Sequence, residues 1–403
     1  MSKRVPEGWS RSTLGKVAKL TMGQSPSSDT YNTENNGLPF FQGNADFGSR
    51  YPRVRYWCNE PTKIANEQSI LFSVRAPVGE VNIAPYECCI GRGLAAIDGE
   101  KVHQEFLYQK LQHAKPQFQL LSQGSTFEAV NGSDLKEFDL VLPPVPEQQK
   151  IAAILFSVDD VIEKTRAQID KLKDLKTGMM QELLTKGIGH TEFKDSPVGQ
   201  IPVGWKCKTI GQLADFVTSG SRGWAQYYSE AGSIFIRIGN LTREHINLRF
   251  NDIVYVSPPE SAEGRRTRVQ LGDILISITA DLGVIGVVNE SIGEAYVNQH
   301  ISLVRLIDPT IARWIGHFLM FEDTQKQFVE SNDAGAKAGL NLSAIRNIVV
   351  AIPKQQERDK IVVILDKIDE DVVLKRSRLD RLISIKQALM QDLLTGKVRV
   401  NVD

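Results

Sequence analysis

The sequence contains one long amphipathic segment twice. In the first copy, residues 147–187, apolar side chains recur at alternating intervals of three and four, the pattern of a long helix with one apolar stripe. Adding 210 to each number gives the second copy, residues 357–397, with an apolar residue at every matching position. Even the interruptions coincide, since Thr165 and Lys176 correspond to Lys375 and Lys386. The predicted stripe, or seam, consists of Ile151, Leu155, Val158, Ile162, Ile169, Leu172, Met179 and Leu183, and in the second copy of Ile361, Leu365, Ile368, Val372, Leu379, Leu382, Leu389 and Leu393.

A helix of this length needs a partner for its apolar stripe. It would extend roughly 50–60 Å at about 1.5 Å per residue, which exceeds the core of a compact domain. The charged flanks of both copies suit solvent, so each helix is predicted to pack on its twin as an antiparallel coiled coil with pseudo-two-fold internal symmetry. The alternative is two unrelated long helices, each packed on its own domain.

A second repeated motif marks where the domains begin. Val5-Pro-Glu-Gly-Trp9 opens the chain, and Ile201-Pro-Val-Gly-Trp205 reappears after the first long helix. The predicted organisation is a first domain at 1–146, a helix at 147–187, a second domain at 188–353 and a helix at 354–403.

Each predicted domain mixes helices and strands, with strands predominating. After each tryptophan a short helix is expected, capped by Thr13 or Thr209. β-branched alternating runs then predict strands. The expected strands cover 69–75, 81–84 and 87–97 in the first domain and 273–279, 284–288 and 294–306 in the second, and the expected helices cover 104–111 and 311–321. The fold class is therefore α+β.

Charge and cysteine content restrict the possible functions. The 403 residues carry 48 basic and 48 acidic side chains, which argues against non-specific coating of nucleic acid by a broad basic field. The four cysteines form no CxxC pair and the six histidines are scattered, so neither a disulfide framework nor a metal site is predicted. No apolar run approaches the length of a membrane span, and we expect a cytoplasmic protein.

The usual signatures of enzymes are missing from the sequence. It contains no GxxxxGK[ST], no GxGxxG after a strand, no HExxH and no GxSxG motif. The chain is therefore predicted to act as a reader of another molecule or as a scaffold.

With these features the chain resembles the specificity subunits of type I restriction-modification enzymes. The resemblance rests on the repeated PxGW start, the strand-turn-strand around Ile70 and Ile274, and the run Leu142-Pro-Pro-Val-Pro-Glu-Gln-Gln-Lys-Ile before a long helix that ends Leu183-Leu-Thr-Lys-Gly. The second copy departs from it at Pro353-Lys-Gln-Gln-Glu-Arg.

The resemblance implies a non-catalytic chain with two target-recognition domains. Each domain would read one half of an asymmetric, split sequence in double-stranded DNA, and the helices would be the spacer. Two methyltransferase subunits would dock on this frame and restriction subunits would join them for cleavage. S-adenosylmethionine, ATP and Mg²⁺ would belong to those partners, leaving no cofactor in this chain.

Candidate DNA contacts are side chains that can donate bidentately to base edges or bind phosphates. In the first domain they are Gln42, Asn44, Arg50, Arg53, Arg55, Arg75 and Arg92. In the second they are Ser221, Arg222, Trp224, Arg237, Asn240, Arg243, Arg265, Arg266 and Arg268. For each residue the alternative is an ordinary place on a solvated loop or strand edge.

Two other functions remain open from the sequence. One is a coiled-coil scaffold that holds two protein-binding or ligand-binding domains at a fixed distance. The other is an enzyme with an unrecognised metal-dependent nuclease site. Salt-dependent selection of one duplex favours the DNA reader, failure to select any DNA favours the scaffold, and metal-dependent cleavage favours the nuclease.

Overall fold

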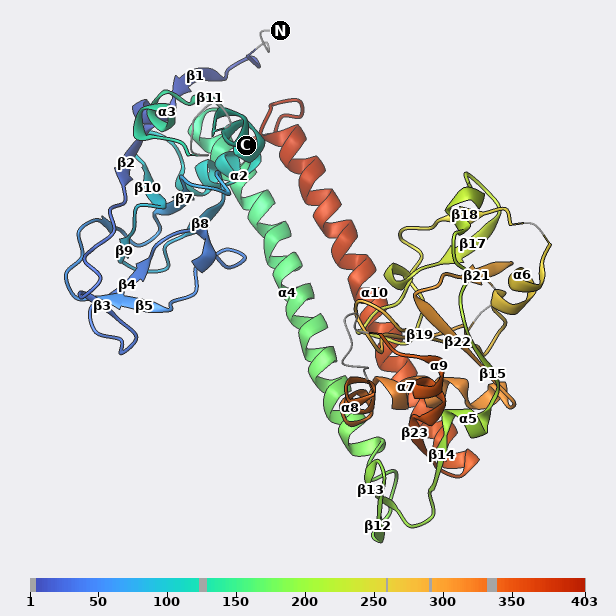
Figure 1. The fold of residues 1–403 in the computed structure, drawn as a ribbon. Coiled ribbons are helices and arrows are strands. Elements are labelled where there is room, and N and C mark those ends of the chain that lie inside the picture. Colours follow the sequence, from blue (N-terminus) through green and yellow to red (C-terminus); the bar gives the residue numbers. More distant parts are fainter. Residues whose placement is uncertain (1–4, 123–128, 259, 290–291, 332–338, 403) are drawn as a thin grey trace. The chain divides into compact units, whose positions relative to one another are not determined.

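A computed structural model describes residues 5–122, 129–258, 260–289, 292–331 and 339–402 (Figure 1). The chain divides into two compact units, one made of residues 1–164 and 379–403, the other of residues 165–378. Each unit therefore contains one domain together with one half of each long helix, α4 (Val145–Leu183) and α10 (Gln355–Leu393). The predicted domain limits differ from these units because they treat each long helix as a separate segment, and they stay a prediction.

The domain of the first unit is built on two sheets. A four-stranded antiparallel sheet has the order β2-β10-β7-β8, and a five-stranded sheet has the order β3-β5-β4-β9-β6 with β4 and β9 parallel. A short ladder joins β1 to β11. The bounds are β1 Ser10–Thr13, β2 Ala18–Met22, β3 Tyr31–Asn32, β4 Leu38–Phe41, β5 Tyr56–Cys58, β6 Ile64–Ala65, β7 Ile70–Ser73, β8 Val81–Ile83, β9 Cys88–Ile90, β10 Leu94–Gly99 and β11 Asp139–Leu142.

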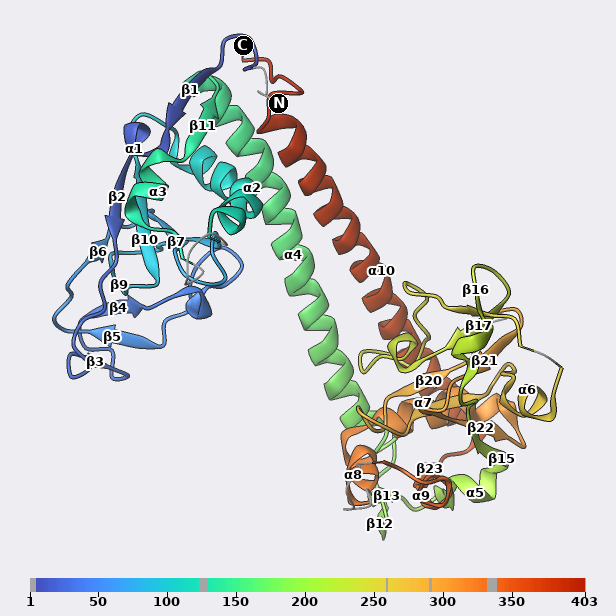
Figure 2. The ribbon, with the colours of Figure 1, turned by 45° about the horizontal axis from the view of Figure 1, so that its top comes forward.

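Helix α2 (Gln104–Ser122) packs between the four-stranded sheet and α4 (Figure 2). Phe118 contacts Phe72 of the sheet with ring centroids 4.8 Å apart, and Tyr108 stacks on Phe156 of α4 at 5.8 Å. Burial of these large rings holds the sheet, α2 and α4 in one core. The remaining elements are α1 Leu14–Val17, the 3₁₀ turn η1 Asn44–Asp46 and α3 Gly132–Glu137.

The second unit repeats this plan. Its four-stranded antiparallel sheet is β15-β22-β19-β20, its second sheet is β16-β18-β17-β21 with β17 and β21 parallel, and β14 pairs with β23. An added hairpin pairs β12 with β13. The strands are β12 Phe193–Ser196, β13 Gly199–Pro202, β14 Lys206–Thr209, β15 Ala214–Ser219, β16 Tyr228–Ser229, β17 Ser233–Ile236, β18 Tyr255–Val256, β19 Ile274–Ser277, β20 Ile285–Val287, β21 Ala295–Val297, β22 Ile301–Leu306 and β23 Val349–Ile352.

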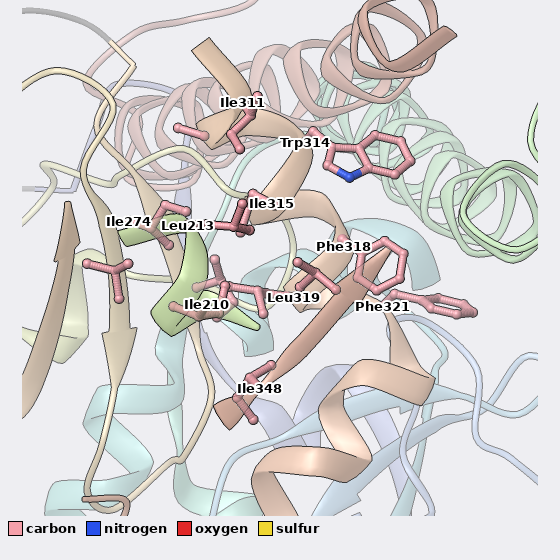
Figure 3. Packing of buried hydrophobic residues seen from close by; sticks show 14 of the residues in the cluster. Ile210, Leu213, Ile274, Ile311, Trp314, Ile315, Phe318, Leu319, Phe321 and Ile348 are labelled. Atoms are coloured by element: carbon pink, nitrogen blue, oxygen red, sulfur yellow. The ribbon is translucent and has the colours of Figure 1, made fainter. Parts of the chain in front are cut away.

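Helix α7 (Ala312–Met320) is the core helix of the second unit, the counterpart of α2. Figure 3 shows Trp314, Ile315 and Phe318 of this helix among buried side chains from the sheet and from α5 (Ile210–Leu213). Trp205 crosses Trp314 edge to face, with 5.5 Å between the ring centroids. The other elements are η2 Trp224–Tyr227, η3 Ile238–Asn240, α6 Ala262–Thr267, η4 Pro309–Ile311, α8 Glu322–Glu330 and α9 Leu342–Asn347.

Inside each unit the halves of α4 and α10 run antiparallel. In the first unit Asp159 pairs with Lys386 at 2.7 Å, while Glu147 pairs with Arg399 at 2.8 Å. In the second unit Lys176 pairs with Asp369 at 2.6 Å, while Gln168 accepts from Lys375 at 2.8 Å. In both units the partners' residue numbers increase along α4 as they decrease along α10 and the residues after it. The predicted antiparallel direction is therefore confirmed within each unit.

The predicted seam is only part of the buried helix surface. Eleven of the predicted residues are buried, and Val158, Leu172, Met179, Leu382 and Leu389 are half-buried. Phe156, Met180, Leu184, Met390 and Leu394 are buried in addition. Leu184 and Leu394 belong to the domain cores of the second and first unit respectively, so each helix buries one side on its twin and another on a domain.

Several local expectations were wrong in detail. Residues 87–97 and 294–306 each hold two strands, β9 with β10 and β21 with β22, because the chain turns between them at Gly91 and at Asn298. The short helix after Trp9 ends at Val17, and Thr13 forms no side-chain cap, whereas Thr209 caps α5 with Gln212. Helix α2 continues to Ser122, well beyond the predicted end at residue 111.

Candidate nucleic-acid interface

A concave surface in the first unit gathers five of the predicted DNA contacts. It has a volume of 360 Å³, and its polar lining includes Gln42, Asn44, Arg55, Arg75 and Arg92. These side chains come from the end of β4, the turn η1, the start of β5, the loop after β7 and the turn between β9 and β10. Positions as far apart in sequence as 42 and 92 are therefore brought together by the sheets.

Two glycines let the loops approach one another at this surface. A Cβ atom on Gly91 would lie 2.9 Å from the Cα of Gln42, and one on Gly93 would lie 2.5 Å from the Gln42 carbonyl oxygen. Only glycine fits such backbone contacts without movement. The sequence Gly91-Arg92-Gly93 therefore holds the exposed Arg92 beside Gln42.

Asp46 fixes the position of Arg55. Its carboxylate is buried, accepts from the backbone N–H of Gln42 at 3.0 Å, and accepts from Nε of Arg55 at 2.8 Å. This hydrogen bond and charge raise the pKa of the Arg55 guanidinium. Arg55 thus stays charged and oriented, while Arg75 and Arg92 are exposed and their side chains form no ion pair among the described residues.

The other two candidates of the first unit lie elsewhere. Arg50 stacks on Phe156, with its guanidinium carbon 4.1 Å from the ring centroid, and it lies 3.7 Å from Asp160 of α4. Arg53 is exposed and its backbone N–H donates to the Asp46 carbonyl oxygen at 2.8 Å. Arg50 is therefore engaged with the helices, and Arg53 lies next to the concave surface without lining it.

The second unit has the same scaffold with different side chains at the same places. Strand pairing aligns Ser73 with Leu94 in the first unit and Ser277 with Ile301 in the second. Two residues beyond each pair lie Arg75 and Arg92 in the first unit, and Thr279 and Gln299 in the second. Two arginines are therefore replaced by a hydroxyl and an amide.

Thr279, Gln299 and His300 form a connected group that the sequence analysis missed. The Thr279 Oγ1 lies 2.8 Å from Nδ1 of His300, and Gln299 Nε2 lies 3.0 Å from Nε2 of the same ring. The sequence could have indicated Thr279, because segment 273–279 aligns with segment 69–75 and Thr279 then corresponds to Arg75.

The nine candidates of the second unit fall into three groups. Ser221, Trp224 and Asn240 are buried; Trp224 belongs to an aromatic cluster, and Asn240 holds its own loop by donating to the Arg249 carbonyl oxygen at 2.9 Å. A second group is engaged within the unit: Arg237 with Asp252, Arg243 with Asp281, Arg266 with the Ser219 carbonyl, and Arg268 with Glu294. Arg222 and Arg265 are exposed, and no partner of their guanidinium groups is found among the described residues.

The arrangement can bind a polyanion at several points and can discriminate between bases. Arginine fits the acceptor pair of guanine, and glutamine or asparagine fits the donor and acceptor of adenine. The two domains therefore present different hydrogen-bonding side chains at equivalent positions of one scaffold.

A model of the family described as the type I restriction modification DNA specificity domain matches residues 6–174 and again residues 202–383. The chain belongs to this family and carries two such domains. The resemblance seen in the sequence is confirmed.

Curated relatives agree with this assignment. The chain is 44% identical over 185 residues to the MjaX type I restriction enzyme specificity subunit of Methanocaldococcus jannaschii, a match that spans 45% of this chain and 44% of that relative. Over 98% of its length it is 23% identical to the MjaVIII specificity subunit of the same organism, of which 94% is covered.

A solved structure shares the fold. The S subunit of a type I restriction-modification system from M. genitalium has a TM-score of 0.66 at 16% identity, and the match covers 98% of both chains. At this identity the likeness concerns the fold alone, a repeated α+β domain with two long helices.

The described residues lack two further features. No described helix combines the length and apolarity that crossing a bilayer requires. No group of three or more His, Cys, Asp or Glu side chains in that part of the chain is arranged to hold a metal ion.

Proposed function

We propose that this chain reads a split, asymmetric sequence in double-stranded DNA, one half with each unit. The observation that carries the proposal is the pair of equivalent loop surfaces with unlike donors, Arg75 and Arg92 in the first unit and Thr279 and Gln299 in the second. An asymmetric target follows, because the same scaffold presents different hydrogen-bonding groups to its two half-sites.

In the proposed complex the chain provides specificity and its partners provide chemistry. Two methyltransferase subunits would dock on the paired helices, and restriction subunits would join them. S-adenosylmethionine, ATP and Mg²⁺ would be bound by those partners, and this chain would be non-catalytic. The support is family membership and the solved relative from a type I system.

The experiment is selection of duplexes from a random library by the full chain with its methyltransferase partner. We expect one split motif with a fixed gap. Arg75→Ala with Arg92→Ala should relax the first half-site and leave the second unchanged, and Gln299→Ala with Thr279→Ala should do the reverse. Each lost bidentate contact should cost about 1–3 kcal/mol of discrimination.

A charge control separates base reading from general attraction. Lys16 and Lys19 of the first unit are exposed, and no partner for either side chain is found among the described residues. Replacing both with alanine removes the same charge as the Arg75 and Arg92 pair, and should leave the selected motif unchanged. Recovery of no motif, or loss of both half-sites from one pair of substitutions, would contradict the proposal.

A further inference from the structure

The second unit has a pocket whose cationic side chains have no cationic counterparts at the equivalent positions of the first unit. It has a volume of 420 Å³ and lies where β14, β23 and the start of α10 meet the turn before α7. Its lining includes four cationic side chains, Lys206, Lys208, Lys354 and Arg358, and one carboxylate, Asp308. The DNA-reading surface proposed above involves none of these residues.

Arg358 is an unusual residue at this place. Its side chain is only 10% exposed, its Nε lies 3.3 Å from Oδ1 of Asp359, and its charge also acts on the nearby Asp308 carboxylate. Arg358 lines the pocket, and no hydrogen bond of its Nη groups is found among the described residues. A guanidinium with so little exposure and with free N–H donors favours an anionic ligand beside it.

The three lysines are not neutralised either. Lys206, Lys208 and Lys354 are exposed, and no ion pair of theirs is found in the described part of the chain. The one carboxylate is already engaged, since Asp308 Oδ1 accepts from the backbone N–H and the hydroxyl of Thr310 at 3.0 and 2.6 Å. Those hydrogen bonds, together with the charge of Arg358, lower the pKa of Asp308.

Two of the cations lie at a helix end where positive charge is unfavourable. Lys354 immediately precedes α10 and Arg358 lies in its first turn. The N-terminus of a helix carries partial positive charge, so cations there are unfavourable and anions are favourable. An anion bound in the pocket would be stabilised by the side chains and by the helix end together.

The first unit serves as an internal comparison. Strand pairing places Ser10 and Ser12 where the second unit has Lys206 and Lys208. The offset of 210 places Pro144 and Gln148 opposite Lys354 and Arg358. All four cations are therefore absent from the first unit, so the fold does not require them.

The floor of the pocket favours a protein over a nucleic acid. Leu213, Ile311, Ile352 and Pro353 form it, and Ile307 at its edge is 70% exposed. Glu100 of the first unit corresponds to Ile307, because its N–H donates to the carbonyl oxygen of Val17 at the end of α1, as the N–H of Ile307 donates to that of Leu213 at the end of α5. Phosphates would gain nothing from this apolar floor, and no aromatic side chain lines it for base stacking.

We propose that this pocket docks an acidic segment of a partner protein, with a carboxylate on Arg358 and the lysines and an apolar side chain on the Leu213–Ile311 floor. Because the first unit lacks these side chains, each chain offers one such site. The partner would therefore bind this subunit asymmetrically.

The test uses the full chain and a fluorescent short peptide of alternating Glu and Leu, with a Lys–Leu peptide and inorganic pyrophosphate as comparison ligands. Binding is read by fluorescence anisotropy. The Glu–Leu peptide should bind, and Lys208→Ser with Arg358→Gln should weaken it by roughly tenfold to a hundredfold, the range for lost charge-assisted hydrogen bonds. Serine and glutamine are the residues of the first unit at these positions, so both should be compatible with the fold.

Lys150→Ser with Lys171→Gln is the charge-matched control on α4, where both lysines are exposed. It should bind the peptide as the unchanged chain does. The proposal is overturned if the pocket variant keeps its affinity, if the control loses as much, or if the acidic peptide does not bind while pyrophosphate or a DNA duplex does. Duplex selection with the same pocket variant should be unchanged, which separates this result from failure of the DNA-reading proposal.

Discussion

Two lysines, Lys176 buried and Lys386 half-buried, interrupt the apolar stripes of the long helices, and each has an aspartate partner. Lys176 is 7% exposed and Asp369 0%, and the related pair is Lys386 at 13% and Asp159 at 19%. The two pairs are related by the 210-residue offset. Charged partners in otherwise apolar stripes penalise every register in which they do not meet.

Removing one member of the more buried pair should be strongly destabilising. In Lys176→Met the carboxylate of Asp369 stays buried without its partner. We expect the free energy of local unfolding to fall by about 3–5 kcal/mol. Hydrogen exchange of the α10 amides around residue 369 measures it. Lys171→Met, at an exposed position on the same helix, should change little.

The double variant Lys176→Met with Asp369→Leu should recover most of that loss, because no uncompensated charge remains. If the single variant were as well protected as the unchanged chain, the ion pair would have no role in helix packing.

Glu244 provides a pH-dependent contact inside the second unit. It lies 2.6 Å from Lys173 of α4 and 2.6 Å from Arg376 of α10. Burial alone would raise the pKa of its carboxyl, but hydrogen bonds from Arg376 and Lys173 outweigh burial and lower the pKa to about 2. The stabilisation is complete above the ordinary value of 4.5 and is lost as pH falls toward 2.

Glu244→Gln should therefore lower the thermal unfolding midpoint near neutral pH. The groups are partly exposed, so the effect should be about 0.5–1 kcal/mol. The difference from the unchanged chain should shrink between pH 4.5 and pH 2. Glu230→Gln, at an exposed position in the same unit, is the control, and a difference independent of pH would contradict the assignment.

At the scale of elements, α4 and α10 each serve two partners. One side packs on the other long helix and another on a domain, which explains why Leu184 and Leu394 are buried outside the predicted seam. The direction of pairing is set by the ion pairs and the apolar residues together.

A cysteine pair tests this direction in the first unit. With Leu155→Cys and Leu389→Cys, a disulfide or a short bismaleimide bridge should form within one chain, because antiparallel packing brings these positions together. Peptide mapping by mass spectrometry identifies the bridge. The comparison variant has Leu155→Cys with Leu365→Cys, and efficient bridging there would mean parallel helices.

At the scale of the whole molecule, the helices are predicted to measure the gap between the half-sites. An insertion of one turn, about four residues, opposite each other in α4 and α10 would lengthen both by about 6 Å. The preferred gap should increase by roughly two base pairs at about 3.4 Å each. Duplex selection reads the gap directly, and an unchanged gap with intact half-sites would show that the helices do not set it.

The duplication also predicts how half of the chain behaves. A fragment ending near Gly189 exposes its helix seam, at about 1.5 kcal/mol or more for each large side chain. It should dimerise, since a second copy offers matching apolar positions and Asp159 where the full chain has Asp369. With the methyltransferase partner it should select a palindromic split target. A monomer by sedimentation, or a preference for the asymmetric target, would contradict this.

The sequence by itself determined the duplication, the two long helices and the α+β class, because these depend on periodicity and on local pattern. An offset of 210 residues and a run of alternating intervals are visible without coordinates. The repeated segments 147–187 and 357–397 begin within two residues and end within four residues of α4 and α10, whereas the predicted helix 354–403 extends ten residues beyond Leu393. The family followed from the same motifs.

Only the tertiary structure decided which polar residues face solvent. Trp224 and Asn240, predicted as DNA contacts, are buried, while Arg50 packs on Phe156. Residues 42, 75 and 92 meet on one surface because strand order, not sequence distance, places them there. Exposure and proximity of a side chain depend on contacts between distant segments, and those contacts leave no periodic signal in the sequence around the residue.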